Sequence, residues 1–137
     1  MSSILQRLFS AGFSGSDGLA QPEREAIVDA LHYCMYADRS IALAETKVIN
    51  DWQETLAWNP QLPFSTYEPR SIAAARQALE SAENRDAFIN NIALRTKSKT
   101  AKETLMRLCR KMADADGKRS EQEWSFIEAL RRAVGAA

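Results

Sequence analysis

Acidic residues at a repeated spacing are the part of this chain best suited to chemistry. Asp38 and Glu45 have six residues between them, and Asp116 and Glu123 repeat that spacing later in the chain. Asp114 lies just before the second pair and would add another oxygen donor. Carboxylate oxygens are the ligands that Ca²⁺, Mg²⁺ and Mn²⁺ prefer. The pattern therefore predicts a divalent-cation site at Asp38, Glu45, Asp114, Asp116 and Glu123.

The same acids have a second interpretation as helix caps. Ser120 and Glu123 form an S-x-x-E capping box, in which both side chains bond backbone N–H groups at a helix start. Asp116 opens an ordinary Asp-Gly turn, and an acid in a first helical turn also favours the helix dipole. In the earlier pair, Ala42 stands where Ser120 does and cannot cap, yet Glu45 is still present. Cation binding and capping therefore both stay open.

Helices are the elements that position these acids. The chain has only five glycines and four prolines, and no segment alternates in the manner of a β-strand. Apolar residues instead recur with the spacing of amphipathic helices. We expect helices over residues 22–37 and 42–57, from Pro69, from an N-cap at Asn84, from Lys99 and from Glu121, with a further short helix near Ile4 to Phe9.

Two of the expected helix pairs are related by an internal repeat. An offset of 78 residues aligns Ile27 with Leu105, and further apolar matches continue through both acid pairs. In each copy the aspartate ends one helix and the glutamate begins the next, so the turn brings the two carboxylates together. If the hairpins pack about a pseudo-twofold axis, all four carboxylates converge. The expected fold class is all-α, a single-domain pseudo-symmetric bundle of about six to seven helices.

The segments that carry the acids resemble a known family. Residues 36–45 read YADRSIALAE and residues 113–123 read ADADGKRSEQE. Both look like the paired A-D-G…E helix hairpins of the TerB-like, tellurite-resistance family. The similarity covers roughly residues 22–134. Arg39 departs from the pattern, because it stands where the motif has glycine and places a cation beside the first aspartate.

The resemblance implies a fold, a setting and a function. It implies a TerB-like all-helical domain over residues 22–137. The amphipathic start and the glycines that follow it predict an N-terminal short helix and Gly/Ser-rich linker over residues 1–21. The setting that the resemblance implies is bacterial and cytoplasmic, in a response to tellurite or another stress. The function we expect is that of a non-enzymatic module that binds a divalent cation through its paired acids. The alternative is a helical protein-interaction bundle whose acids only cap helices and bind no metal.

Charge and composition argue against several function classes. Eighteen basic and eighteen acidic residues give zero net charge, which removes the basic signature of a dedicated nucleic-acid binder. No apolar run approaches the roughly 18 residues of a membrane span, so we expect no stable membrane insertion. A phosphate loop and the HExxH and GxSxG motifs are absent from the sequence, so no enzyme is expected.

Charge is nevertheless unevenly distributed along the chain. From residue 95 onward there are eleven basic and six acidic residues, whereas residues 1–94 carry seven and twelve. Such a basic region suits an acidic protein partner or the acidic half of a second copy, and a solvated surface is the alternative. The basic helix face that we expect contains Arg95, Lys97, Lys99, Lys102 and Arg110.

The histidine and the two cysteines follow no catalytic pattern. His32 lies one position off the apolar stripe of its helix, so we expect it at the surface or facing a partner. Cys34 and Cys109 lie on apolar helix faces and are expected to be buried structural thiols.

Overall fold

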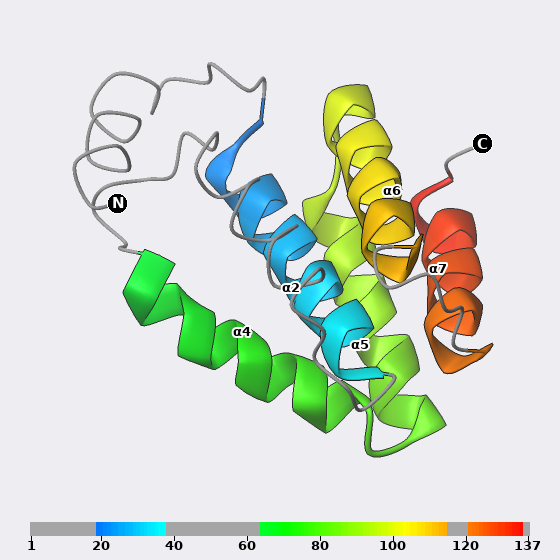
Figure 1. Ribbon diagram of the computed structural model, residues 1–137. Coiled ribbons are helices and arrows are strands. Elements are labelled where there is room, and N and C mark those ends of the chain that lie inside the picture. Colours follow the sequence, from blue (N-terminus) through cyan, green and yellow to red (C-terminus); the bar gives the residue numbers. More distant parts are fainter. Residues whose placement is uncertain (1–18, 38–63, 115–120, 136–137) are drawn as a thin grey trace.

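The computed structural model describes residues 19–37, 64–114 and 121–135 (Figure 1). These residues form five α-helices and contain no strand, which confirms the all-α prediction for this part of the chain. The helices expected near Ile4 and over residues 42–57 lie outside these ranges, so the count of about six to seven helices stays a prediction. The described helices are α2 (Gln21–Ala37), α4 (Phe64–Ala78), α5 (Ala82–Arg95), α6 (Lys99–Asp114) and α7 (Glu121–Val134).

The start of α4 differs from the sequence prediction. The sequence predicts Pro69 at the head of this helix, but the proline lies inside it, since α4 already begins at Phe64. A proline inside a helix removes one backbone hydrogen bond and is normally unfavourable. Here the side chains on either side of it, Tyr67 and Ser71, are both anchored by hydrogen bonds to Asp29 of α2. These tertiary contacts offset the local cost of the proline.

The start of α5 also differs from the prediction. Ser81 is the N-cap, because its hydroxyl accepts the backbone N–H of Asn84 at 3.0 Å. The prediction that Asn84 itself is the cap is therefore wrong. Its side chain instead donates to the carbonyl oxygen of Gln77 at 3.1 Å, which fastens α5 to the end of α4. The helices α2, α6 and α7 begin where the sequence indicates, to within one residue.

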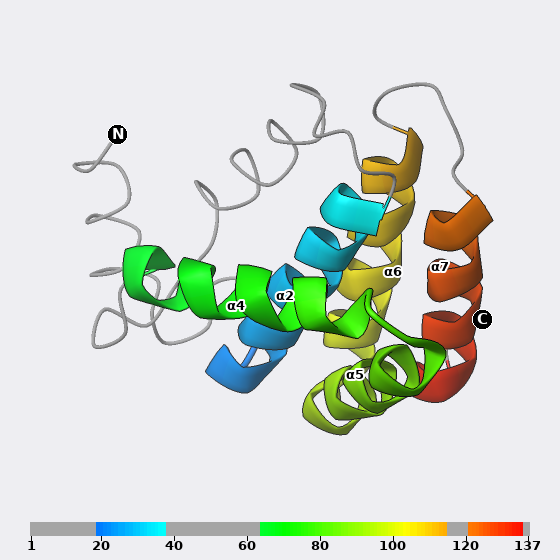
Figure 2. The same ribbon diagram turned by 90° about the horizontal axis from the view of Figure 1, so that it is seen from below.

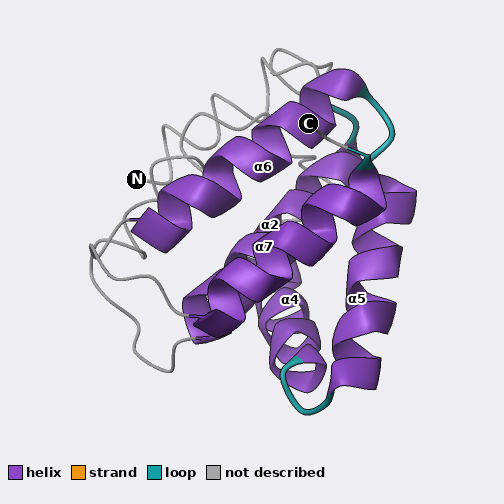
Figure 3. Ribbon diagram, turned by 90° about the vertical axis from the view of Figure 1, so that its right-hand side faces the viewer, coloured by secondary structure: helices purple, strands orange, loops and turns teal. Residues whose placement is uncertain are grey.

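α2 is the central helix of the described bundle. It contacts each of the other four helices, and thirteen of its seventeen residues are buried. Figure 3 shows α6 and α7 side by side on one side of the bundle, with α4 behind them. The predicted burial of both thiols is confirmed, since Cys34 of α2 and Cys109 of α6 lie in the shared core.

An aromatic stack joins three of the helices. Tyr33 of α2 is fully buried and lies against Phe126 of α7, with ring centroids 3.9 Å apart. On α5, the ring of Phe88 is 5.7 Å from the Tyr33 ring. Aromatic side chains bury large apolar areas, so this stack fixes α5 and α7 against the central helix.

One carboxylate ties the starts of α2 and α6 together. Glu23, in the first turn of α2, accepts the backbone N–H groups of Lys97 at 3.0 Å and Ser98 at 2.8 Å, just before α6 begins. Its other oxygen accepts the N–H of Ala20 at 3.0 Å. Burial raises the pKa of Glu23. The hydrogen bonds that Glu23 accepts, first of all those from Ala20 and Ser98, together lower this pKa by more than burial raises it, so the pKa lies below its ordinary value. The two helix starts therefore share one charged anchor.

The shared anchor makes α2 and α6 run in the same direction. The helices have 17 and 16 residues, so they are about equally long. Figures 1 and 2 show that both end at the same end of the bundle, which is also where α7 begins. Ala37 of α2, Asp114 of α6 and the first turn of α7 therefore share one end of the fold.

Candidate functional site

The structure describes two of the five predicted cation ligands. Asp38, Glu45 and Asp116 lie outside the described residues. Asp114 is the exposed last residue of α6, whereas Glu123 lies in the first turn of α7 and is only 1% exposed. Within the described ranges, no three His, Cys, Asp or Glu side chains are grouped so that they could hold a metal ion. The five-residue cation site therefore stays a prediction.

A second polar centre lies in the middle of α2, at a residue that the sequence analysis did not single out. Asp29 is 5% exposed. Its Oδ1 accepts hydrogen bonds from the Tyr67 hydroxyl at 2.7 Å and the Ser71 hydroxyl at 2.6 Å, both on α4. Its Oδ2 forms an ion pair with Nη2 of Arg95, on α5, at 2.7 Å. Burial of a carboxylate is unfavourable unless it is paired and hydrogen-bonded, and here both oxygens are satisfied.

His32 extends this network, and the prediction that it lies at the surface is wrong. It is 1% exposed, and its Nδ1 is 2.8 Å from the hydroxyl oxygen of Ser71. The Ser71 proton is donated to Asp29, so we infer that Nδ1 carries a proton and donates to Ser71. Burial lowers the pKa of His32 to about 4, although the charge of Asp29 acts in the opposite direction. His32 is therefore neutral at pH 7.

The other members of the network keep their ordinary protonation states. Burial, followed by the charge of Asp29, raises the pKa of Tyr67 well above its usual value, so Tyr67 remains a hydroxyl donor. Burial lowers the pKa of Arg95, but the hydrogen bond to Asp29, the charge of Asp29 and the contact with Tyr67 together raise it by more, so the guanidinium remains charged. The centre is thus one ion pair with neutral donors around it.

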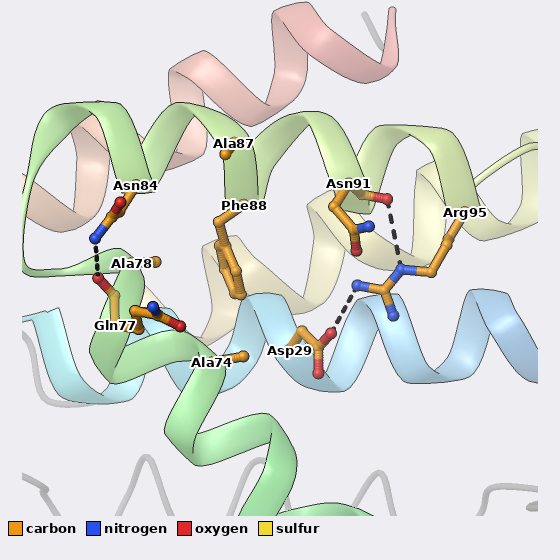
Figure 4. Close-up of a pocket in the computed structure, with 9 residues that line it drawn as sticks. All are labelled: Asp29, Ala74, Gln77, Ala78, Asn84, Ala87, Phe88, Asn91 and Arg95. Carbon is orange, nitrogen blue, oxygen red and sulfur yellow. Dashed lines mark hydrogen bonds and ion pairs between the residues drawn. The ribbon is translucent and has the colours of Figure 1, made fainter.

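A pocket opens beside the ion pair, between α4 and α5 (Figure 4). Its volume is about 340 Å³, which lies in the range of small-molecule sites. Asp29 and Arg95 lie at one end, and the Phe88 ring points toward α2 near the middle (Figure 4). The other six lining residues are of two kinds. The carboxamide groups belong to Asn84, Asn91 and Gln77, and three alanines form short walls.

The charged groups that line this pocket are already engaged within the fold. Both oxygens of Asp29 are engaged, and Nε of Arg95 donates to the carbonyl oxygen of Asn91 at 3.4 Å. The nine lining residues include no cysteine, serine, threonine or histidine, which are the usual nucleophiles or bases of enzymes. The arrangement therefore positions a guanidinium and several amides. The sequence signal that could have found it is an aspartate in the middle of an otherwise apolar helix.

The basic face predicted from the sequence is only partly correct. Arg95 does not belong to it, because its guanidinium is paired with Asp29 inside the bundle. Lys97 precedes α6 and is exposed, and Lys99 and Arg110 are exposed on α6 itself. Together with Lys102, they lie along the side of α6. The exposed basic face is therefore a feature of α6.

Comparison of the chain with protein families, curated proteins and solved structures finds no match in any of the three. No helix in the described ranges is long and apolar enough to cross a membrane.

Proposed function

We propose that this chain is a non-enzymatic, TerB-like module that binds a divalent cation through its duplicated acidic residues. The setting that the TerB resemblance implies is a cytoplasmic stress response, such as resistance to tellurite. The ligands in this proposal are Asp38, Glu45, Asp114, Asp116 and Glu123. The ions that suit such oxygen ligands are Ca²⁺, Mg²⁺ and Mn²⁺.

The observation that carries the proposal is the common direction of α2 and α6. The 78-residue offset of the repeat aligns the first residues of the two helices, Gln21 and Lys99. Because Glu23 joins their starts, the helices end at the same end of the bundle. In the sequence, Asp38 follows α2 directly and Asp116 follows the last residue of α6 by two positions. The last residues of the two helices, Ala37 and Asp114, therefore lie at the same end of the bundle.

Glu123 also lies at this end of the bundle, in the first turn of α7. Glu123 is among the most buried polar residues of the described chain. Buried carboxylates need a compensating charge or hydrogen bonds. A bound cation would add to the interactions that Glu123 already makes within the protein.

The second candidate function is a protein-interaction bundle in which the acids only cap helices. The S-x-x-E pattern at Ser120 and Glu123 favours it, because a capping box also places a glutamate in a first turn. In that case Glu123 stabilises the fold equally with and without metal. The two functions therefore differ in how stability depends on added cation.

The test is calorimetric titration of the chelator-treated full chain with Ca²⁺, Mg²⁺ and Mn²⁺. We expect at least one ion to bind with a dissociation constant below about 1 mM and to raise the melting temperature. Glu123→Gln keeps the side-chain shape and should weaken binding at least about tenfold, a loss of about 1.4 kcal/mol. Glu83→Gln is the matched control, since Glu83 is an exposed acid in the first turn of α5. Absence of binding at millimolar ion, or equal loss in both variants, would favour the capping bundle.

A further inference from the structure

Most cations on the outward side of α6 have no carboxylate within ion-pair distance in the described part of the chain. The helix has five basic and two acidic residues. Among the described residues, no carboxylate lies within ion-pair distance of Lys102, Arg107, Arg110 or Lys111. Lys99 reaches Glu103 only at 3.9 Å. On the other helices, Arg85, Arg95 and Arg131 each have an acidic partner within 3.3 Å. Arg70, Arg76 and Arg132 have no carboxylate within ion-pair distance among the described residues.

The spacing of these cations is unfavourable for α6 taken alone. Lys99 and Lys102 are three positions apart, and so are Arg107 and Arg110. Arg107 and Lys111 are four apart. Residues at these spacings are neighbours on a helix surface, so like charges there repel. Glu103 lies four positions from both Lys99 and Arg107 and offsets part of this repulsion. An anionic partner laid along this side would convert the repulsion into attraction.

A groove runs along the same side of α6 and reaches the end of α7. Its volume is about 500 Å³, and it lies between α6 and Gly135. Met106 provides an apolar surface within it, while Lys102 and Arg110 lie along its rim. The groove can therefore receive an apolar side chain flanked by acidic ones.

The corresponding side of α2 is the side on which other helices pack. The 78-residue offset aligns Asp29 with Arg107, His32 with Arg110 and Tyr33 with Lys111. On α2, Asp29 binds residues of α4 and α5, and Tyr33 stacks on rings of α5 and α7. The three aligned residues of α6 are all exposed. A surface that is covered by helices in one copy is thus uncovered in the other.

We propose that this side of α6 is the docking surface for an acidic amphipathic helix of a partner protein. The surface, which we call the α6 basic face, consists of Lys99, Lys102, Met106, Arg107, Arg110 and Lys111. Its cations extend over about 18 Å of helix, which complements acids repeated at helical spacing on a partner. The apolar groove at Met106 would hold one apolar side chain of that helix. The proposal is independent of cation binding at the acidic residues.

Other anionic partners fit the α6 basic face less well. Single-stranded nucleic acids are usually held by bases stacked on aromatic rings as well as by cations. The sequence has no aromatic residue between Arg95 and Arg119. Membrane surfaces bind amphipathic helices through exposed large apolar residues, whereas Met106 is buried at the base of the groove. A folded acidic helix uses both the charges and the groove.

The test is fluorescence anisotropy on the full chain with a labelled helical peptide that bears glutamates at three-to-four spacing and one central leucine. We expect micromolar binding at low salt that weakens at least about tenfold at high salt. A peptide of the same composition with scrambled spacing should bind at least about fivefold more weakly. The double variant Lys102→Glu/Arg110→Glu should lose at least about tenfold in affinity.

The controls separate this surface from general charge attraction. Arg70→Glu/Arg76→Glu makes the same charge change at exposed positions of α4 and should leave binding within about twofold. Circular dichroism checks the fold, and Lys102→Gln/Arg110→Gln replaces the charge-reversed variant if that one unfolds. Equal loss in the α4 control, equal binding of the scrambled peptide, or tighter binding of a 20-nucleotide DNA or of anionic vesicles to the α6 basic face would overturn the proposal.

Discussion

α2 and α6 bury apolar residues at aligned positions, but their other sides differ in chemical character. Ile27 and Leu105 align at the 78-residue offset and are both fully buried, as are Leu31 and Cys109. Other aligned positions of the two helices carry different kinds of side chain. On α2 they form a buried polar network around the Asp29–Arg95 ion pair with α4 and α5, and on α6 they are exposed cations.

The difference teaches that neighbours, rather than the helix itself, decide what a shared pattern becomes. Thirteen of the seventeen residues of α2 are buried, so the polar groups among them need partners inside the protein. α6 is covered on one side only, so its polar groups can remain in water. An aspartate at position 29 is therefore structural, whereas an arginine at the aligned position 107 is available for binding.

The largest expected effect comes from removal of the Asp29 carboxylate. Asp29→Ala leaves the Tyr67 and Ser71 hydroxyls and the Arg95 guanidinium without their shared acceptor. We expect the free energy of unfolding to fall by about 3 kcal/mol, measured by urea denaturation. Arg107→Ala, at the aligned position of α6, should change it by less than about 0.5 kcal/mol. Similar losses in the two variants would show that the two helices do not differ in this way.

The next effect is the pH dependence that His32 contributes. Its pKa is about 4 in the fold, against the ordinary value of 6.5 in an unfolded chain, so the unfolded chain binds the proton more readily. The stability from neutral His32 is therefore fully present above pH 6.5 and is lost as the pH falls toward 4. A shift of this size corresponds to about 3 kcal/mol at most.

His32→Asn isolates this contribution, because it keeps an N–H donor near Ser71 and cannot be protonated in this range. Between pH 7 and pH 4, the unfolding free energy of the parent chain should fall more steeply than that of the variant. Thermal unfolding at a series of pH values measures the difference. Parallel pH profiles for the two proteins would exclude His32 as the group responsible.

Helix positions could be predicted from the sequence where strong local signals exist. Pro22 with its acidic first turn, and the apolar spacing that follows, correctly indicates α2. The same kind of signal correctly indicates the starts of α6 and α7. The apolar residues of α5 are not all buried, since Leu94 is 71% exposed. Periodicity therefore locates the helices better than it locates the residues that they bury.

The polar network could not be predicted because its partners are far apart in the chain. Asp29 and Arg95 are separated by 66 positions, and Asp29 and Ser71 by 42. Local patterns carry no information about such pairs. The position of His32 off the apolar stripe of α2 predicts a surface residue. This prediction assumes that the side of the helix away from its apolar stripe faces solvent, whereas His32 and most other residues of α2 are buried.

A smaller effect is expected at the anchor that joins the two helices. Glu23→Ala removes the acceptor of three backbone N–H groups at the starts of α2 and α6. We expect a loss of about 1 to 2 kcal/mol in the free energy of unfolding, since loss of a helix-capping acceptor has this magnitude. The hydrogen exchange of the Ser98 amide should also become faster. Glu25→Ala, a partly exposed neighbour in the same helix, is the control and should cost less than about 0.5 kcal/mol.

The smallest effect is a gain in stability on the α6 basic face. Lys102→Glu removes the repulsion with Lys99 and places an acid near the start of α6, where the helix dipole favours it. We expect the free energy of unfolding to rise by about 0.3 to 0.5 kcal/mol, which the urea midpoint can detect. The aligned residue of α2, Arg24, is buried, so Arg24→Glu should instead cost about 3 kcal/mol or more. A Lys102→Glu variant that is less stable than the parent would show that repulsion between Lys99 and Lys102 does not destabilise α6.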